Sequence, residues 1–137
     1  MHNAEVSVIA DSISTHVPRI TTFQLRYWRP IHSELMTHRK FSRSAGSSRA
    51  RPSKAIIEQV YNDPWGPIHW GKNQPGMQAS NELGHTDKTT AVDIWQFSAQ
   101  QAAKEAQRLL DLGAHKQIVN RILEPYTYID VVVTATE

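Results

Sequence analysis

The residues with the clearest chemical potential lie in one stretch, residues 37–49, which reads Thr-His-Arg-Lys-Phe-Ser-Arg-Ser-Ala-Gly-Ser-Ser-Arg. Small residues let a backbone approach an anion, hydroxyl groups donate hydrogen bonds, and the planar arginine head group pairs with phosphate oxygens. The stretch lies between two predicted helices, and the amides that begin the second, at Pro52, would add to an anion site. These features predict a phosphate cradle. An exposed Ser/Arg loop without a ligand is the alternative.

The charge distribution also favours an anionic ligand. Residues 1–54 hold nine Lys or Arg and three Asp or Glu, a net charge of +6, whereas residues 55–137 hold six and ten, a net charge of −4. Six cations and no acid fall within residues 39–54. Because such a segment typically meets phosphate, a small nucleic-acid-binding module that uses residues 39–54 is a second hypothesis. The acidic second half and the lack of a nucleic-acid-binding motif argue against it.

Composition narrows the chemistry further. The chain has no cysteine, which excludes disulfides, thiolate metal sites and a cysteine nucleophile. Its seven histidines form no His-x-x-x-His pair, so we expect no metal site. The chain has 137 residues, no apolar stretch of about 20 residues and no basic-then-apolar leader. We therefore expect a single domain over residues 1–137 of a cytoplasmic protein that does not contact a membrane.

The order of residues in the 37–49 stretch resembles the signature of the flavin-dependent thymidylate synthases. That signature reads Arg-His-Arg, then seven residues, then Ser, usually with Asn-Glu in the gap and Gly-Arg after the serine. Five positions match in register: His38, Arg39, Ser42, Ser47 and Arg49. Four positions depart from the pattern: Thr37 replaces the first Arg, Ser44 and Ala45 replace Asn-Glu, and Ser48 replaces Gly.

The resemblance extends to residues 20–23, 69–74, 115–125 and 132–137, closest to versions typical of phages, and so covers essentially the whole chain. It implies an α+β fold with a mixed sheet and packed helices, assembled as a homotetramer with sites between subunits. The implied reaction is the methylation of dUMP to dTMP. Methylenetetrahydrofolate would give the carbon, and FAD, reduced by NADPH, would give the hydride. This route needs no cysteine nucleophile, in agreement with the composition.

The same resemblance implies roles for individual residues. His38 and Arg39 fall at flavin-contacting positions, and Ser14 lies near a position that contacts the flavin phosphates. The nucleotide-contacting positions are those of Glu34, Ser47, Ser48, Arg49 and Arg121, of which Ser47 and Arg49 are the closest to catalysis. For Arg121, an ion pair with Glu124, three residues further on, is the structural alternative. Thr37 and Ala45 lose an Arg and a Glu that contact ligands in the family, so we expect altered geometry at the flavin ring or the uracil.

The chain stops at Glu137, directly after a predicted core strand. A further Arg that acts on the uracil, and a His-containing flavin contact, would follow this point in the family. We therefore expect an N-terminal part of the synthase, with a C-terminal half supplied separately. A non-catalytic fragment that keeps the fold is the third hypothesis.

The elements that must position these residues can be read from apolar periodicity. Strands are predicted over residues 4–10, 20–27 and 128–135. A helix should begin near Pro30 and end before the serine-rich segment 42–48, which is predicted to be a loop. Further helices are predicted from Pro52, over 93–112 with Gly113 as its C-terminal cap, and over 115–123, with breaks at 62–76 and 80–90.

Overall fold

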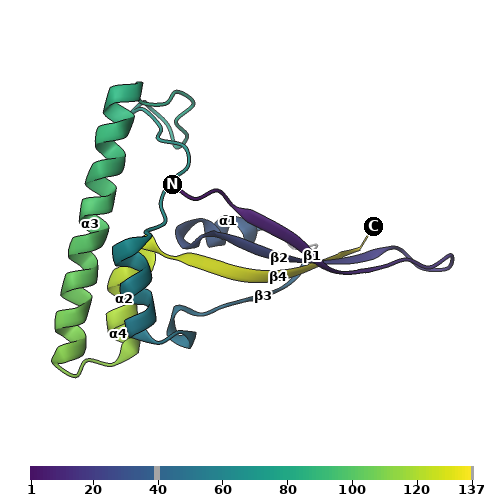
Figure 1. Ribbon diagram of the computed structural model, residues 1–137. Coiled ribbons are helices and arrows are strands. Elements are labelled where there is room, and N and C mark those ends of the chain that lie inside the picture. Colours follow the sequence, from purple (N-terminus) through teal and green to yellow (C-terminus); the bar gives the residue numbers. More distant parts are fainter. Residues whose placement is uncertain (39–40, 137) are drawn as a thin grey trace.

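The computed structural model describes residues 1–38 and 41–136 and consists of one sheet joined to a layer of helices (Figure 1). The sheet contains four strands, β1 (Glu5–Ser12), β2 (Ile20–Trp28), β3 (Ser42–Ala45) and β4 (Tyr128–Thr136). The α-helices are α1 (His32–Leu35), α2 (Ser53–Asn62), α3 (His85–Asp111) and α4 (Lys116–Val119). Three 3₁₀ helices complete the chain: η1 (Arg29–Ile31), η2 (Ser48–Ala50) and η3 (Asn120–Tyr126).

The sheet has the order β1-β2-β4-β3, and all three pairings are antiparallel. The predicted α+β class is therefore confirmed, but the predicted mixed sheet is wrong. A parallel pair would need a crossover connection, whereas here β4 returns from the helical layer between β2 and β3 and runs opposite to both.

One face of the sheet is apolar because alternate residues of β2 and β4 point to the same side. Tyr27 lies opposite Ile129, and Leu25 lies opposite Val131. Leu35 of α1 packs against this face and helps to cover it. The predicted inward side of the 20–27 strand is thus confirmed. The buried residues of this cluster are Tyr27, Ile129, Val131 and Val133.

The second core lies between α2, α3 and η3. Three alanines of α3, at four- and three-residue spacing, let the neighbouring helix approach closely. The buried residues of this cluster are Ile56, Val60, Ala99, Ala103, Ala106, Val119 and Leu123. The helix ends where Gly113 takes a φ of +88°, and the amides of Gly113 and Ala114 donate to the carbonyls of Leu110 and Leu109 at 3.0 and 3.1 Å. The predicted glycine cap is confirmed.

Aromatic side chains join the sheet to the helical layer. The ring of Trp95, on α3, contacts the rings of Trp28 and Tyr126 at centroid distances of 5.8 and 5.3 Å. Its indole nitrogen donates to the carbonyl oxygen of Trp65 at 2.9 Å, and Trp65 is only 3% exposed. Trp65 is therefore a core residue, while Trp28 and Trp95 are half-buried, and the contacts among these rings fix the orientation of α3 against the end of the sheet.

Two predicted boundaries are wrong. The serine-rich segment contains the strand β3, which lacks apolar alternation and forms because β4 offers it an unpaired edge. Helix α3 begins at His85, so most of the predicted break at 80–90 is helical. No Gly or Pro follows Gly84 in this region, and Asp87 lies in the first turn, where an acid stabilises a helix.

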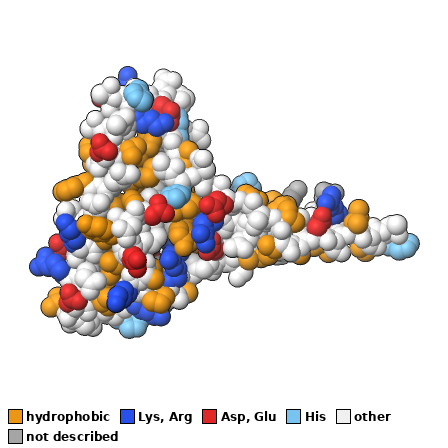
Figure 2. All heavy atoms as spheres, viewed as in Figure 1, with side chains coloured by type: hydrophobic (Ala, Val, Ile, Leu, Met, Phe, Trp, Pro, Cys, Tyr) orange, Lys and Arg blue, Asp and Glu red, His pale blue; other side chains and the backbone are white. Residues whose placement is uncertain are grey.

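Strands β1 and β2 extend beyond the body as an arm that ends in the turn 13–19 (Figure 1). All of β1 is exposed, and hydrophobic side chains are visible along the arm (Figure 2). Among them are Val6, Ile9 and Ile13, which are 65, 53 and 79% exposed. Among the helices described here, none combines the length and apolar character needed to cross a membrane.

The helical core generates a stability prediction. Leu123 has an exposed fraction of 0%, so we expect Leu123→Ala to lower the free energy of unfolding by about 2–5 kcal/mol. Leu112→Ala is the matched control, because Leu112 is 84% exposed, and it should change stability by less than about 0.5 kcal/mol. Urea denaturation followed by circular dichroism measures both. Equal losses in the two variants would contradict this assignment of the core.

Candidate functional site

The motif loop, residues 46–51, directly follows the edge strand β3. Its first amide, that of Gly46, donates to the carbonyl oxygen of Asp130 at 3.0 Å. The hydroxyl of Ser47 accepts from the amide of Arg49 at 3.2 Å, and the amide of Ala50 donates to the Ser47 carbonyl at 3.0 Å. Because the Ser47 hydroxyl acts here as an acceptor, its proton remains available for a ligand. The Arg49 side chain is exposed and has no hydrogen bond or ion pair within the described part of the chain.

Two side chains of η3 hold the motif loop from behind. The amide group of Asn120 donates to the carbonyl oxygens of Ser48 and Arg51 at 2.8 and 3.2 Å. A carboxylate oxygen of Glu124 accepts from the hydroxyl of Ser48 at 2.6 Å. The Ser48 hydroxyl proton is therefore used inside the protein, while the neighbouring Ser47 hydroxyl faces outward.

Arg29 links the motif loop to the strands. Its guanidinium donates to the carbonyl oxygen of Gly46 at 3.2 and 3.3 Å, and to that of Tyr128 at 3.4 Å. Burial lowers the pKa of Arg29, but an arginine side chain stays protonated in a protein even so. A buried cation needs acceptors, so this side chain fixes the loop relative to the start of β4.

A hollow of about 290 Å³ lies beside α1. Its walls are mostly apolar, with Leu25, Tyr27 and Ile31 among them, and Glu34 and His38 add polar groups. A second hollow of about 250 Å³ shares Tyr27 and Ile31 with the first and also contains Trp28 and His69. Both hollows can accept a flat, largely apolar ring with polar edges.

The structure arranges the predicted site residues in two groups. Ser47, Ser48 and Arg49 lie together on the motif loop, with the exposed Arg121 on η3 behind them. Glu34 and His38 line one hollow, as described above. Arg29 connects the groups, because it begins the segment η1–α1 that carries Glu34 and also contacts the motif loop.

The remaining predicted residues lie elsewhere. Ser14 is in the turn at the far end of the arm, where its hydroxyl accepts from the amide of His16 at 3.2 Å. Arg39 lies outside the described residues. The predicted alternative for Arg121, an ion pair with Glu124, is wrong, because the Glu124 carboxylate turns toward Ser48 and the described residues include no such pair.

One departure from the motif, Thr37, and the neighbouring Arg43 have local partners. The Thr37 hydroxyl donates to the carbonyl oxygen of Glu34 at 2.7 Å and so caps the end of α1. The guanidinium of Arg43 donates to the carbonyl of Met36 at 3.2 Å and to that of His38. A cation from β3 thus lies beside the position where the first Arg of the motif is absent.

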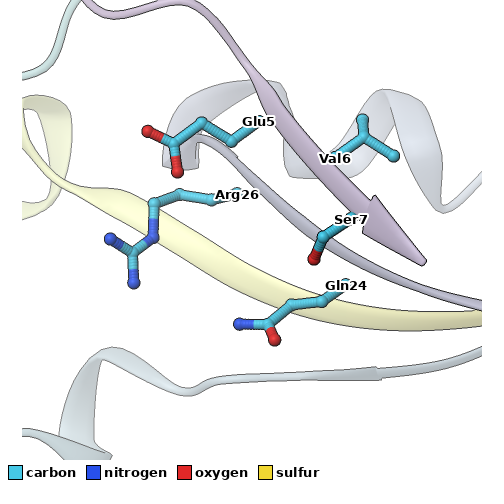
Figure 3. A pocket seen from close by; sticks show the side chains of 5 residues that line it. All are labelled: Glu5, Val6, Ser7, Gln24 and Arg26. Atoms are coloured by element: carbon cyan, nitrogen blue, oxygen red, sulfur yellow. The ribbon is translucent and has the colours of Figure 1, made fainter. Parts of the chain in front are cut away.

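The opposite, polar face of the sheet contains another hollow, of about 340 Å³ (Figure 3). Glu5 and Ser7 from β1 and Gln24 and Arg26 from β2 line it. The Arg26 guanidinium is bound by Asp130 through contacts of 2.7 and 3.1 Å, which raises the pKa of Arg26. With its cation neutralised and Glu5 beside it, this hollow suits an anion less well than the motif loop does.

Sequence reasoning did not identify Arg29 and Asn120, and it considered Glu124 only as a partner of Arg121. No local pattern marks these residues, because their contacts join segments 17 to 99 residues apart. The described residues bring together no group of three or more histidine or acidic side chains that could hold a metal ion.

Comparison with solved structures identifies the fold. The UMP/dUMP methylase PolB from Streptomyces cacaoi bound with 5-Br dUMP has a TM-score of 0.75 and 18% sequence identity, over 99% of this chain and 74% of that chain. The same methylase bound with 5-Br UMP has a TM-score of 0.72 and 18% sequence identity, over 99% of this chain and 73% of that chain. Thymidylate Synthase X (ThyX) from Helicobacter pylori with FAD and dUMP has a TM-score of 0.48 and 16% sequence identity, over 86% of this chain and 52% of that chain. No protein-family model and no curated protein sequence matches the chain.

His32, on α1, generates a pH prediction. Its ring nitrogen Nδ1 lies 2.5 Å from the Tyr27 hydroxyl, and burial, with the charges of Arg29 and Arg43, lowers the pKa of His32 below its ordinary 6.5. The unfolded chain therefore takes up this proton first as pH falls. The free energy of unfolding should decrease as pH falls from 6.5 through the lower folded value.

His32→Gln removes the titrating group and should reduce this slope. Urea denaturation of both proteins across this pH range measures the difference. Identical slopes for the wild type and the variant would contradict the assignment.

Proposed function

We propose that this chain is a pyrimidine-nucleotide methylase that methylates dUMP to dTMP with a flavin cofactor. The observation that carries the proposal is the motif loop, on a fold shared with a UMP/dUMP methylase. This loop presents the Ser47 hydroxyl and the Arg49 guanidinium, which has no partner among the described residues. Since the chain has no cysteine, a thiolate of this chain cannot attack the uracil ring. Catalysis would rest on positioning the nucleotide beside a cofactor.

The nucleotide would bind at the motif loop. Arg49 would pair with its phosphate, because a guanidinium offers two parallel donors to phosphate oxygens. Ser47 would donate its free hydroxyl proton, and Ser48 would contribute its backbone, since its own hydroxyl is held by Glu124. Arg121 and Glu34 would add a cation and an acceptor from η3 and α1.

The flavin ring would lie in the hollow beside α1. The residues there fit such a group, because the apolar and aromatic walls suit a flat ring, and Glu34 and His38 provide polar contacts. Arg39 and Ser14 remain proposed contacts for the rest of the cofactor. Reduced FAD supplies a hydride when bound, with NADPH as the proposed reductant and methylenetetrahydrofolate as the proposed carbon donor.

The decisive test is the visible absorption spectrum of the purified chain with added FAD, recorded before and after dUMP. A bound-flavin spectrum that shifts on addition of dUMP is expected, because the two proposed groups of residues are linked through Arg29. UMP in place of dUMP tests whether the ribonucleotide is also accepted. Binding of RNA or DNA that weakens with salt, without any flavin signal, would favour the nucleic-acid hypothesis instead.

The proposal predicts the effect of removing the phosphate-binding cation. Arg49→Ala should weaken dUMP binding by about 10- to 100-fold, as a charge-assisted hydrogen bond contributes about 1.5–3 kcal/mol. Isothermal titration calorimetry measures the affinity. Arg108→Ala, on the exposed side of α3, is the matched control and should bind as the wild type does. Unchanged dUMP affinity in Arg49→Ala would contradict the assigned role.

A further inference from the structure

We propose that Asn120 and Glu124 are positioning residues of the nucleotide site, which hold the motif loop so that Ser47 and Arg49 face the nucleotide. This inference rests on the proposed function for the identity of the ligand. Neither residue would contact the nucleotide in this role. They act through the backbone and through Ser48, and the following contacts carry the argument.

Asn120 fixes the backbone on both sides of Arg49. Its amide group reaches the carbonyl oxygens of Ser48 and Arg51 at 2.8 and 3.2 Å, and these residues flank Arg49 at one and two positions. Asn120 is only 1% exposed, and its side-chain oxygen, Oδ1, is buried and accepts no hydrogen bond within the described chain. Such an unpaired buried acceptor costs stability. Since the oxygen makes no favourable contact, the two hydrogen bonds that the amide nitrogen donates to the loop are the favourable contribution of this polar side chain.

Glu124 determines which hydroxyl of the loop faces outward. Its carboxylate holds the Ser48 hydroxyl at 2.6 Å, so Ser48 is turned toward η3. The hydroxyl of Thr127 donates to the Glu124 carbonyl oxygen at 2.9 Å and fixes the backbone of this acid. A free Ser48 side chain would compete with Ser47 for any ligand at the loop.

Asn120 lies beside two residues of the helical core. Asn120 follows Val119 directly and precedes Leu123 by one turn, and both apolar residues have an exposed fraction of 0%. The motif loop, in contrast, follows an edge strand of only four residues and is largely exposed. A rigid support thus holds a weakly supported loop, which is how a binding residue is kept within the small positional range that binding requires.

The test separates positioning from folding. Asn120→Leu keeps the branched shape of the side chain, with a larger volume, but removes both donors. Asn62→Leu is the matched control, because Asn62 is exposed and, within residues 1–38 and 41–136, its side chain hydrogen-bonds only to the Glu58 carbonyl of its own helix. Hydrogen exchange of the amides in the peptide covering 46–51 reports on loop order without a nucleotide. Calorimetry with dUMP and the melting temperature are measured on the same samples.

We expect Asn120→Leu to raise loop exchange and to weaken dUMP binding by about tenfold each, as two hydrogen bonds are lost, while Asn62→Leu changes neither. Glu124→Gln keeps an acceptor for Ser48 and should retain dUMP affinity, whereas Glu124→Leu should not. If Asn120→Leu is too unstable to purify, the Glu124 pair provides the same comparison.

The proposal would be overturned by unchanged loop exchange in Asn120→Leu and Glu124→Leu, or by raised exchange with wild-type dUMP affinity. A fall in melting temperature with no change in affinity would show a purely structural role and also overturn it. Failure of the wild-type chain to bind dUMP is a different outcome, since it overturns the proposed function. Loop exchange, measured without nucleotide, then decides separately whether η3 orders the loop.

Discussion

The half-buried charge of Arg29 is the constraint on which the rest of the site depends. Its guanidinium must find acceptors where water is scarce, and it finds them in the carbonyls of Gly46 and Tyr128. Its own amide donates to the Thr127 carbonyl at 3.0 Å. One residue at the end of β2 thereby fixes the start of β4, the beginning of the motif loop and the segment that leads into α1. The two groups of proposed ligand-binding residues are held together at this point.

The sequence predicted the elements whose apolar side chains repeat with the period of their own structure. Strand β2 alternates, β4 is an apolar and β-branched run, and the alanines of α3 recur at helical spacing, so local pattern and burial agree. Strand β3 could not be predicted, because Ser42–Ala45 is a strand only through its pairing with β4. The first turns of α3 were missed for a related reason, since His85 and the residues after it form no apolar stripe. Sheet order and direction depend on long-range pairing, which no local window contains.

The candidate site divides in the same way. Motif spacing alone was enough to single out Ser47 and Arg49, and the structure places both on one exposed loop. Motif spacing could not single out Asn120, because an asparagine near the end of a helix usually serves as a local cap. The contact between Asn120 and Ser48 spans 72 residues. Nor could motif spacing show that the two adjacent serines differ, because that difference arises from Glu124. The residues proposed to contact a ligand thus lie in a sequence pattern, whereas the residues proposed to position them lie in none.

The uneven charge of the chain has a structural explanation that bears on the ligand. Two acids of the net-negative second half act on the basic first half in different ways. Asp130 forms an ion pair with Arg26, whereas Glu124 accepts a hydrogen bond from the hydroxyl of Ser48 and its charge favours the charged form of Arg29. Arg43 is held by carbonyl oxygens, and Arg49 has no side-chain partner within the described residues. Positive charge is therefore cancelled on the polar face of the sheet and left uncancelled at the motif loop. Because uncompensated cations beside a free hydroxyl attract a phosphate more strongly than paired ones do, this charge distribution favours the proposal that an anion binds at the motif loop and not in the larger hollow on the polar face.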